Sequence, residues 1–265
     1  MLPDCSLQNH KMLPSKLLLV GPAAFRSFRC LWMLEELEVP FDHSMARPQS
    51  KESKQNHPLG KIPSLVVNDG EFCLYESASI NTYLADAYNS KLVPQRPRTS
   101  TTPGDPEQES SSYQSFVQQR AKYDQTVTFI MTEMDAQGLW IQRKHESLSK
   151  LFGKSPAAVQ EAKRQFQSAN QVLVDQLNPY LLGADFSAAD ILYAHCLEWA
   201  EEIGWAKDDA LFEDNGDGKL QHYLRQCRSR QAYVRAAARR EKEEQAKLKY
   251  LREKAAATRN PLSKI

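Results

Sequence analysis

The spacing of apolar residues divides the chain into two parts. Before about residue 95, short apolar runs of strand type alternate with helical spacing, which predicts an α/β unit that begins with a strand and a helix and continues through a hairpin into another helix. Asn68-Asp69-Gly70 separates the two hairpin strands, and this composition favours a turn. The predicted strands cover residues 16–20, 64–67 and 72–75, and the helices cover 27–37 and a stretch starting at Ser77.

The second part of the chain has only helical periodicity. Helical patterns over 113–140, 157–177 and 187–203 predict an all-α domain, and Ser187 with Asp190 three residues later predicts the cap of the last of these helices. Between the two parts, residues 95–112 contain almost no apolar side chain, which is typical of a linker or a surface insertion. The expected division is 1–15 (disordered extension), 16–94 (α/β domain), 95–112 (linker), 113–229 (helical domain) and 230–265 (basic helical extension).

Composition limits the class of protein without identifying it. The chain has 265 residues, of which 41% are apolar, and no apolar run reaches membrane-spanning length. The first fifteen residues have no sustained apolar or arginine-rich segment, so we expect no targeting peptide there. The five cysteines have neither metal-site nor redox-motif spacing, and no His cluster indicates a metal site, so we expect a reducing compartment and no bound metal.

The net charge of +1 conceals a strongly basic C-terminus. Residues 225–264 hold thirteen Lys/Arg and four Glu, and 230–258 have the composition of a long helix. A solvated helix is the simpler interpretation. A surface that binds RNA, an acidic protein or an anionic membrane face is the sharper one, and charge alone does not choose among these partners.

Candidate chemistry lies around the predicted hairpin. Ile62-Pro63 precedes a strand after a loop, a place where a cis peptide bond can leave the Ile62 backbone unpaired and able to bond an extended peptide. Glu76-Ser77 stands where the second hairpin strand gives way to a helix, whose N-terminal N–H groups favour a carboxylate while Glu76 can pair with an ammonium group. A γ-glutamyl group carries both charges, so these residues predict a site for a small thiol peptide.

These motifs resemble the glutathione S-transferase family. Gly60-Lys61-Ile62-Pro63 and Glu76-Ser77-Ala78-Ser79-Ile80 match its cis-proline turn and its strand-to-helix junction, and the run Ser27–Leu37 looks like the first helix of its bacterial-type members. The similarity extends to the helical half and covers roughly residues 16–235, including Leu139-Trp140-Ile141, Lys144-His145, Tyr180–Gly183 and Phe186–Ile191.

The resemblance implies a thioredoxin-like N-terminal domain, a helical C-terminal domain and a cytoplasmic homodimer. It further implies that glutathione binds as co-substrate and that its thiolate attacks a small electrophile, as in detoxification. The residues expected to contact glutathione are Phe25, Arg26, Lys61, Ile62, Pro63, Glu76 and Ser77.

The thiolate-stabilising position departs from the family pattern. Counting back from Arg29 to the usual place of the family's hydroxyl reaches Ala24 or Phe25, neither of which has a side-chain hydrogen-bond donor. Ser27 is the nearest hydroxyl and is the candidate catalytic residue; Arg26 or the N–H groups at the start of the helix are the alternatives. Cys30 lies on the apolar face of that helix and is expected to belong to the core.

Two functional hypotheses follow. The first is a glutathione transferase. The second is a non-catalytic module of the same fold, whose basic C-terminal helix recruits a partner protein or RNA. The final Ser263-Lys264-Ile265 resembles a peroxisomal signal without matching it, so a peroxisomal location is a weaker alternative to the cytoplasm.

Overall fold

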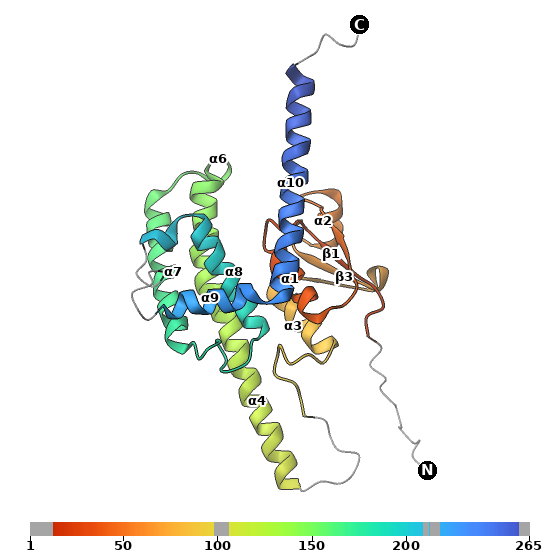
Figure 1. Ribbon diagram of the computed structural model, residues 1–265, viewed down its shortest axis with the longest axis vertical. Helices are drawn as coiled ribbons and strands as arrows, with labels where there is room; N and C mark the ends of the chain where they lie inside the picture. The colour runs from red at the N-terminus through yellow and green to blue at the C-terminus, as the bar shows by residue number, and fades with distance from the viewer. Residues whose placement is uncertain (1–12, 98–105, 209–211, 213–217, 260–265) are drawn as a thin grey trace.

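A four-stranded sheet forms the centre of the N-terminal half in the computed structural model, which describes residues 13–97, 106–208, 212 and 218–259 (Figure 1). β1 pairs in parallel with β2 and antiparallel with β3, and β3 and β4 form a hairpin, so the strand order is β2-β1-β3-β4. The predicted strands are confirmed, whereas β2 was not predicted. The bounds are β1 Leu17–Val20, β2 Asp42–Ser44, β3 Ser64–Val67 and β4 Phe72–Tyr75.

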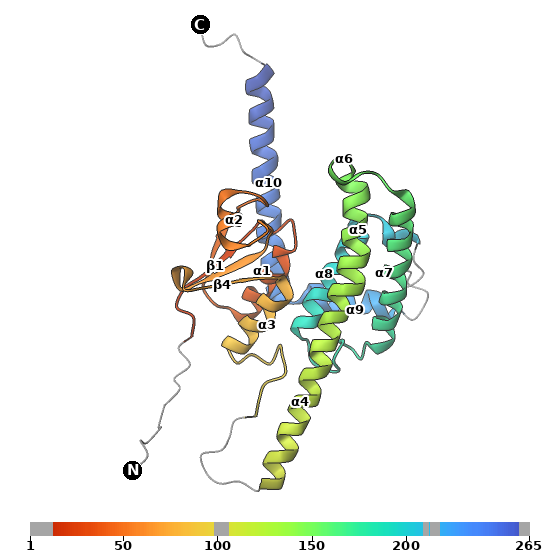
Figure 2. The same cartoon turned by 180° about the vertical axis from the view of Figure 1, so that it is seen from behind.

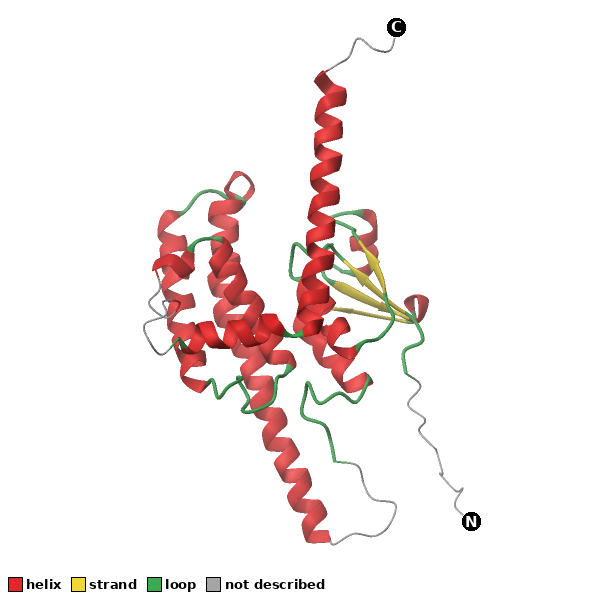
Figure 3. Cartoon of the chain, viewed as in Figure 1, coloured by secondary structure: helices red, strands yellow, loops and turns green. Residues whose placement is uncertain are grey.

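Three helices accompany this sheet: α1 Ser27–Leu37, α2 Lys51–Asn56 and α3 Ser77–Ala87. α1 is buried along most of its length, because it packs against α3 within its own domain and against α8 and α10 from the C-terminal half. Its central side chains, Phe28 and Trp32, are fully buried. The layer of helices beside the sheet gives the thioredoxin-like arrangement that the sequence predicted (Figure 3).

The rest of the chain is helical. The longest helical run starts with α4 and continues through two π-helical segments (Figure 2). Asp190 accepts hydrogen bonds from the backbone N–H and the hydroxyl of Ser187, which confirms the predicted cap of α8. The segments are α4 Pro106–Phe129, π-helical Ile130–Leu139, α5 Trp140–Gln142, π-helical Arg143–Ser147, α6 Ser149–Phe152, α7 Pro156–Gln176, α8 Ala188–Glu202, α9 Lys219–Ser229 and α10 Gln231–Arg259.

The expected linker is shorter than composition indicated. α4 begins at Pro106, inside the segment 95–112, and residues 108–112 are exposed. Proline suits the first turn of a helix, and a helix in water needs no apolar residue there. The lack of apolar residues in 106–112 therefore reflects an exposed helix and not an irregular backbone. Residues 98–105 lie outside the described part of the chain.

The N-terminal extension is described only at its end. Residues 1–12 lie outside the described part, so their expected disorder stays a prediction. Ser15 donates from its backbone N–H to Asn68 Oδ1 at 3.0 Å, which attaches this end of the extension to the hairpin turn.

The C-terminal helix is not a solvated helix along its whole length, and this corrects the simpler expectation. The first turns of α10 lie along α1, and the later turns project beyond both halves (Figure 1). The ring of Tyr233 lies edge-on to Phe28 and Trp32, at centroid distances of 5.8 and 4.9 Å, and its hydroxyl donates to Glu198 at 2.5 Å. α10 thus closes the junction between the two halves.

We expect Tyr233→Ala to lower the free energy of unfolding by about 3 kcal/mol, because it removes a ring from a packed aromatic cluster. Urea unfolding measures the change. Tyr250→Ala, on the projecting part of the same helix where the side chain is 59% exposed, is the matched control and should leave the unfolding midpoint unchanged. Equal effects of the two changes would contradict the packing role of α10.

Candidate functional site

The loop between β1 and α1 approaches the residue before the cis proline very closely. The Ile62-Pro63 peptide bond is cis, as predicted. Gly21 in the loop has a φ of +122°, and a Cβ atom at that position would lie 2.8 Å from Ile62 Cβ and 2.5 Å from Ser27 Oγ. Only glycine fits this close approach and this backbone conformation. The start of α1 and the cis-proline turn therefore border the same space.

The junction between β4 and α3 presents Glu76 in an uncommon conformation. Glu76 has φ +68° and ψ +114°, which is unfavourable for a residue with a side chain. Such strain persists where the surrounding structure fixes it, and it is often found at binding sites. Glu76 directly precedes Ser77, the first residue of α3, so a carboxylate and a helix N-terminus lie side by side.

A groove of about 410 Å³ unites these features. It is formed by the β1–α1 loop, the cis-proline turn, the start of α3 and the helical segment 131–148 from the C-terminal half. The seven residues predicted to contact a glutathione molecule all line it: Phe25, Arg26, Lys61, Ile62, Pro63, Glu76 and Ser77. The remaining lining residues are Pro48, His57, Met131, Thr132, Asp135, Ala136, Trp140, Arg143 and Leu148.

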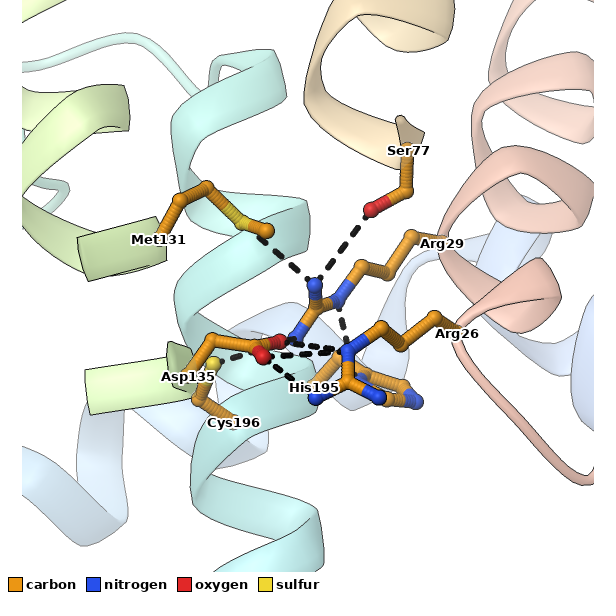
Figure 4. A network of polar contacts seen from close by, with 7 residues as sticks. All are labelled: Arg26, Arg29, Ser77, Met131, Asp135, His195 and Cys196. Carbon is orange, nitrogen blue, oxygen red and sulfur yellow. Dashed lines mark hydrogen bonds and ion pairs between the residues drawn. The ribbon is translucent and has the colours of Figure 1, made fainter. Parts of the chain in front are cut away.

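Two arginines share one carboxylate at the wall of the groove (Figure 4). Arg26 binds both oxygens of Asp135, with Nε at 3.0 and 2.9 Å from them. Arg29, whose side chain is 0% exposed, donates from Nη2 to Asp135 Oδ2 at 2.6 Å. Its other contacts are Ser77 Oγ at 3.3 Å, Met131 Sδ at 3.4 Å, Cys196 Sγ at 3.2 Å and His195 Nδ1 at 3.1 Å.

This cluster carries a net positive charge. Burial raises the pKa of Asp135, but the guanidinium groups of Arg29 and Arg26 outweigh it and hold that pKa well below the usual range. Burial and the Arg29 charge keep the pKa of His195 well below its ordinary value, so its imidazole is neutral and accepts at Nδ1. Two cations therefore face one anion. The surplus charge lies beside the groove and favours an anion there.

Ser27 lies away from the groove. Its side chain is fully buried under Gly21, its hydroxyl has no hydrogen-bond partner within the described part of the chain, and it does not line the groove. It does not cap α1 with its side chain either, since Arg26 occupies the N-cap position. The geometry therefore argues against direct contact between this hydroxyl and a bound thiol.

Comparisons with known proteins also point to the glutathione S-transferases. The family model for the N-terminal domain of glutathione S-transferases matches residues 17–86. The chain is 37% identical to glutathione S-transferase hmp2 of Hypomyces subiculosus over 79 residues, which are 27% of this chain and only 36% of that protein. It is 26% identical over 196 residues, 68% of this chain and 79% of the other, to glutathione S-transferase 1 of Saccharomyces cerevisiae.

The solved structures extend the likeness to both halves. A glutathione transferase family member from Pseudomonas fluorescens, crystallised with two glutathione molecules bound, superimposes with a TM-score of 0.64 at 17% identity. The match covers 85% of this chain and 93% of that one. Residues 17–86 match the N-terminal domain of the glutathione S-transferase family, and both halves together have the fold of its solved members. A thioredoxin-like domain followed by helices is the fold that this family implies.

The groove includes residues that the sequence analysis did not single out as site residues. Asp135 and Arg143 lie on a long helical run, where nothing in their spacing separates them from solvated charges. One signal in the sequence could have marked Asp135 as a buried residue: it directly follows Met134 and lies close to apolar Leu139. Trp140, which the sequence linked only to the helical half of the family, lines the groove as well.

None of the cysteines in the described part of the chain lines this groove. Cys30 and Cys196 are buried and free, and burial raises the pKa of both thiols, that of Cys196 to about 12. Cys30 therefore belongs to the core, as predicted. Within the described ranges, no three His, Cys, Asp or Glu side chains are grouped to hold a metal ion, and no helix is long and apolar enough to cross a membrane.

We expect Asp135→Asn to lower the free energy of unfolding by about 3 kcal/mol, because it leaves the buried Arg29 guanidinium without its counter-charge. In the unchanged protein, the lowered pKa of Asp135 means that this stabilisation is present above about pH 4 and is lost as the pH falls through that lowered value. Thermal unfolding between pH 2 and 7 measures both effects.

Glu161→Gln is the matched control for Asp135→Asn. Glu161 also pairs with an arginine, Arg164, but both side chains are mostly exposed. Exposed pairs contribute little to stability, so the control should unfold like the unchanged protein at every pH. If Asp135→Asn unfolded like this control, the ion pairs of Asp135 with Arg26 and Arg29 would not stabilise the fold.

Proposed function

We propose that this protein binds glutathione in the groove and conjugates it to small electrophiles through the glutathione thiolate. The single observation that carries the proposal is the convergence, in one groove, of the cis-proline turn, the Glu76–Ser77 junction and the start of α1. The groove suits a ligand that has an extended peptide backbone, an amino-acid end and a thiol between them.

The groove residues match the chemical groups of glutathione one by one. The backbone of Ile62 pairs with the cysteinyl backbone of the ligand, as in strand addition. Glu76 binds the γ-glutamyl ammonium group, and the N-terminus of α3 at Ser77 binds the γ-glutamyl carboxylate. Lys61 is exposed at the rim and pairs with the remaining carboxylate of the ligand. This arrangement leaves the thiol directed toward Phe25 and Arg26.

The thiolate is stabilised by charge rather than by a hydroxyl. Arg26 lines the groove at the N-terminus of α1 and belongs to the cluster in which two guanidinium groups share Asp135. A positive helix end and a surplus cation both lower the pKa of a nearby thiol. This proposal replaces Ser27, which the packing under Gly21 keeps from the groove, with Arg26 and the start of α1.

The alternative of a non-catalytic module has less support than the enzyme. Much of the basic charge near the C-terminus is used within the chain: Arg228, Arg230, Arg235, Arg239 and Arg240 each pair with a glutamate. Binding of RNA or an acidic partner by the projecting part of α10 stays a prediction, as do the homodimer and the cytoplasmic location. Ser263–Ile265 lies outside the described residues.

We expect Glu76→Ala to weaken glutathione binding at least tenfold, because the ligand ammonium group loses its counter-ion. Titration calorimetry on the purified protein measures the affinity. Glu71→Ala changes a carboxylate at the other end of the same strand, outside the groove, and should bind glutathione normally. Unchanged affinity in Glu76→Ala would refute the site assignment.

We expect Ser27→Ala to keep turnover of a generic aryl halide within twofold, whereas Arg26→Met should raise the pKa of the bound thiol and lower turnover at neutral pH. The ultraviolet absorbance of the thiolate, followed against pH in the glutathione complex, reports the thiol pKa directly. Loss of turnover in Ser27→Ala with an unchanged thiol pKa in Arg26→Met would return the catalytic role to the hydroxyl.

A further inference from the structure

Arg143 lies where the groove meets a second, smaller cavity. This cavity, of about 100 Å³, is enclosed by the β1–α1 loop, α8 and α10. Three residues line both spaces: Phe25, Arg26 and Arg143. Arg143 therefore lines the groove together with Phe25 and Arg26, the residues toward which the thiol of a bound glutathione is proposed to point.

The guanidinium group of Arg143 has aromatic neighbours but no acidic partner. It lies 5.2 Å from the ring centre of Phe25 and 5.9 Å from that of Trp199. Within the described residues, its side chain forms neither an ion pair nor a hydrogen bond with a carboxylate. Arg26 on the same wall differs, since Asp135 binds it at two oxygens.

The surroundings leave the charge of Arg143 uncompensated. Burial lowers its pKa, and the nearby positive charge of Arg26 lowers it further, with no carboxylate acting in the other direction. Three glutamates line the smaller cavity with Arg143: Glu198, Glu202 and Glu244. Glu198 is already bound by Tyr233, Arg228 and Arg240, and within the described residues neither Glu202 nor Glu244 forms an ion pair with Arg143. A half-buried cation without a counter-ion is costly, and an anionic group on a ligand would offset that cost.

The walls around Arg143 fit a flat ring. Phe25 and Trp140 line the groove together with Met131, so an aromatic ligand there would contact apolar surface on several sides. We propose that Arg143 selects electrophiles in which a flat ring carries a carboxylate, and that it binds this carboxylate. The proposal rests on the proposed conjugating function, which it extends by naming the class of electrophile.

Two aryl chlorides of equal shape test the proposal: 4-chloro-3,5-dinitrobenzoate and its carboxamide. In each reaction, the glutathione sulfur forms a bond to the ring carbon, the carbon–chlorine bond breaks, chloride leaves with the electron pair, and the thiol proton passes to water. The measured quantity is the ratio of kcat/KM for the carboxylate to kcat/KM for the carboxamide, which cancels effects common to both substrates.

We expect Arg143→Met to lower this ratio about tenfold, mainly through a higher KM for the carboxylate, because the variant lacks the charged hydrogen-bond donor. Lys144→Met is the matched control. Lys144 is the next residue and also lies near an aromatic ring, that of Trp140, but it lines neither cavity, so the ratio should not change. An equal loss for both substrates in Arg143→Met would place its charge on the thiolate and overturn the proposal.

Binding of the two conjugates separates this proposal from the conjugating function, because it needs no turnover. If the unchanged protein turns over neither chloride, the conjugating function fails for this substrate class, and calorimetry with the two synthetic glutathione conjugates still decides the role of Arg143. At least fivefold tighter binding of the carboxylate conjugate, lost in Arg143→Met, supports it. Equal affinities, or no binding of either conjugate, overturn it.

Discussion

The buried guanidinium group of Arg29 is the constraint on which the rest of the structure depends. It extends from α1 and reaches Ser77 at the start of α3, Asp135 on the long helical run and His195 on α8. A fully buried cation is tolerated only with such a complete set of partners. Arg29 thereby fixes the helical half against the thioredoxin-like half, at the place where the two enclose the groove.

The same cluster stabilises the fold and supplies the charge on which the proposed thiolate chemistry depends. Asp135 neutralises only one of the two arginines that it binds, and His195 stays neutral because of its burial beside Arg29. The remaining positive charge stands at the N-terminus of α1, whose own dipole has the same sign. A chain that lacks a hydroxyl at Ala24 or Phe25 can thus still favour a thiolate by electrostatic means.

The C-terminal helix supports the β1–α1 loop, which carries the start of the proposed site. Glu243 on α10 accepts a hydrogen bond from the backbone N–H of Ala23 at 2.8 Å and pairs with His43 at 3.3 Å. Arg230 and Arg235 bind Glu36 and Glu35 on the far side of α1. The first turns of the basic extension therefore pack on the N-terminal domain and stabilise it, whereas its later turns are exposed (Figure 2).

The sequence by itself determined the elements whose physical cause is local. Apolar period and turn composition were enough for β1, α1 and the hairpin, and a proline between a loop and a strand marked Ile62-Pro63 as a place where a cis bond can form. The charges of Glu76-Ser77 indicated a γ-glutamyl site, because a carboxylate beside a helix start is a property of adjacent residues. β2 was missed since Asp42–Ser44 is short and polar, and only pairing with β1 makes it a strand.

Only the tertiary structure decided what depends on residues far apart in the chain. The burial of Ser27 follows from the close approach of Gly21, and the role of Asp135 follows from two arginines more than 100 positions away. The basic residues near the C-terminus could be counted from the sequence, but the glutamates with which they pair could not be identified from it. Whether an arginine faces solvent or a glutamate on α1 is fixed by the packing of Tyr233 against Phe28 and Trp32, which no local pattern records.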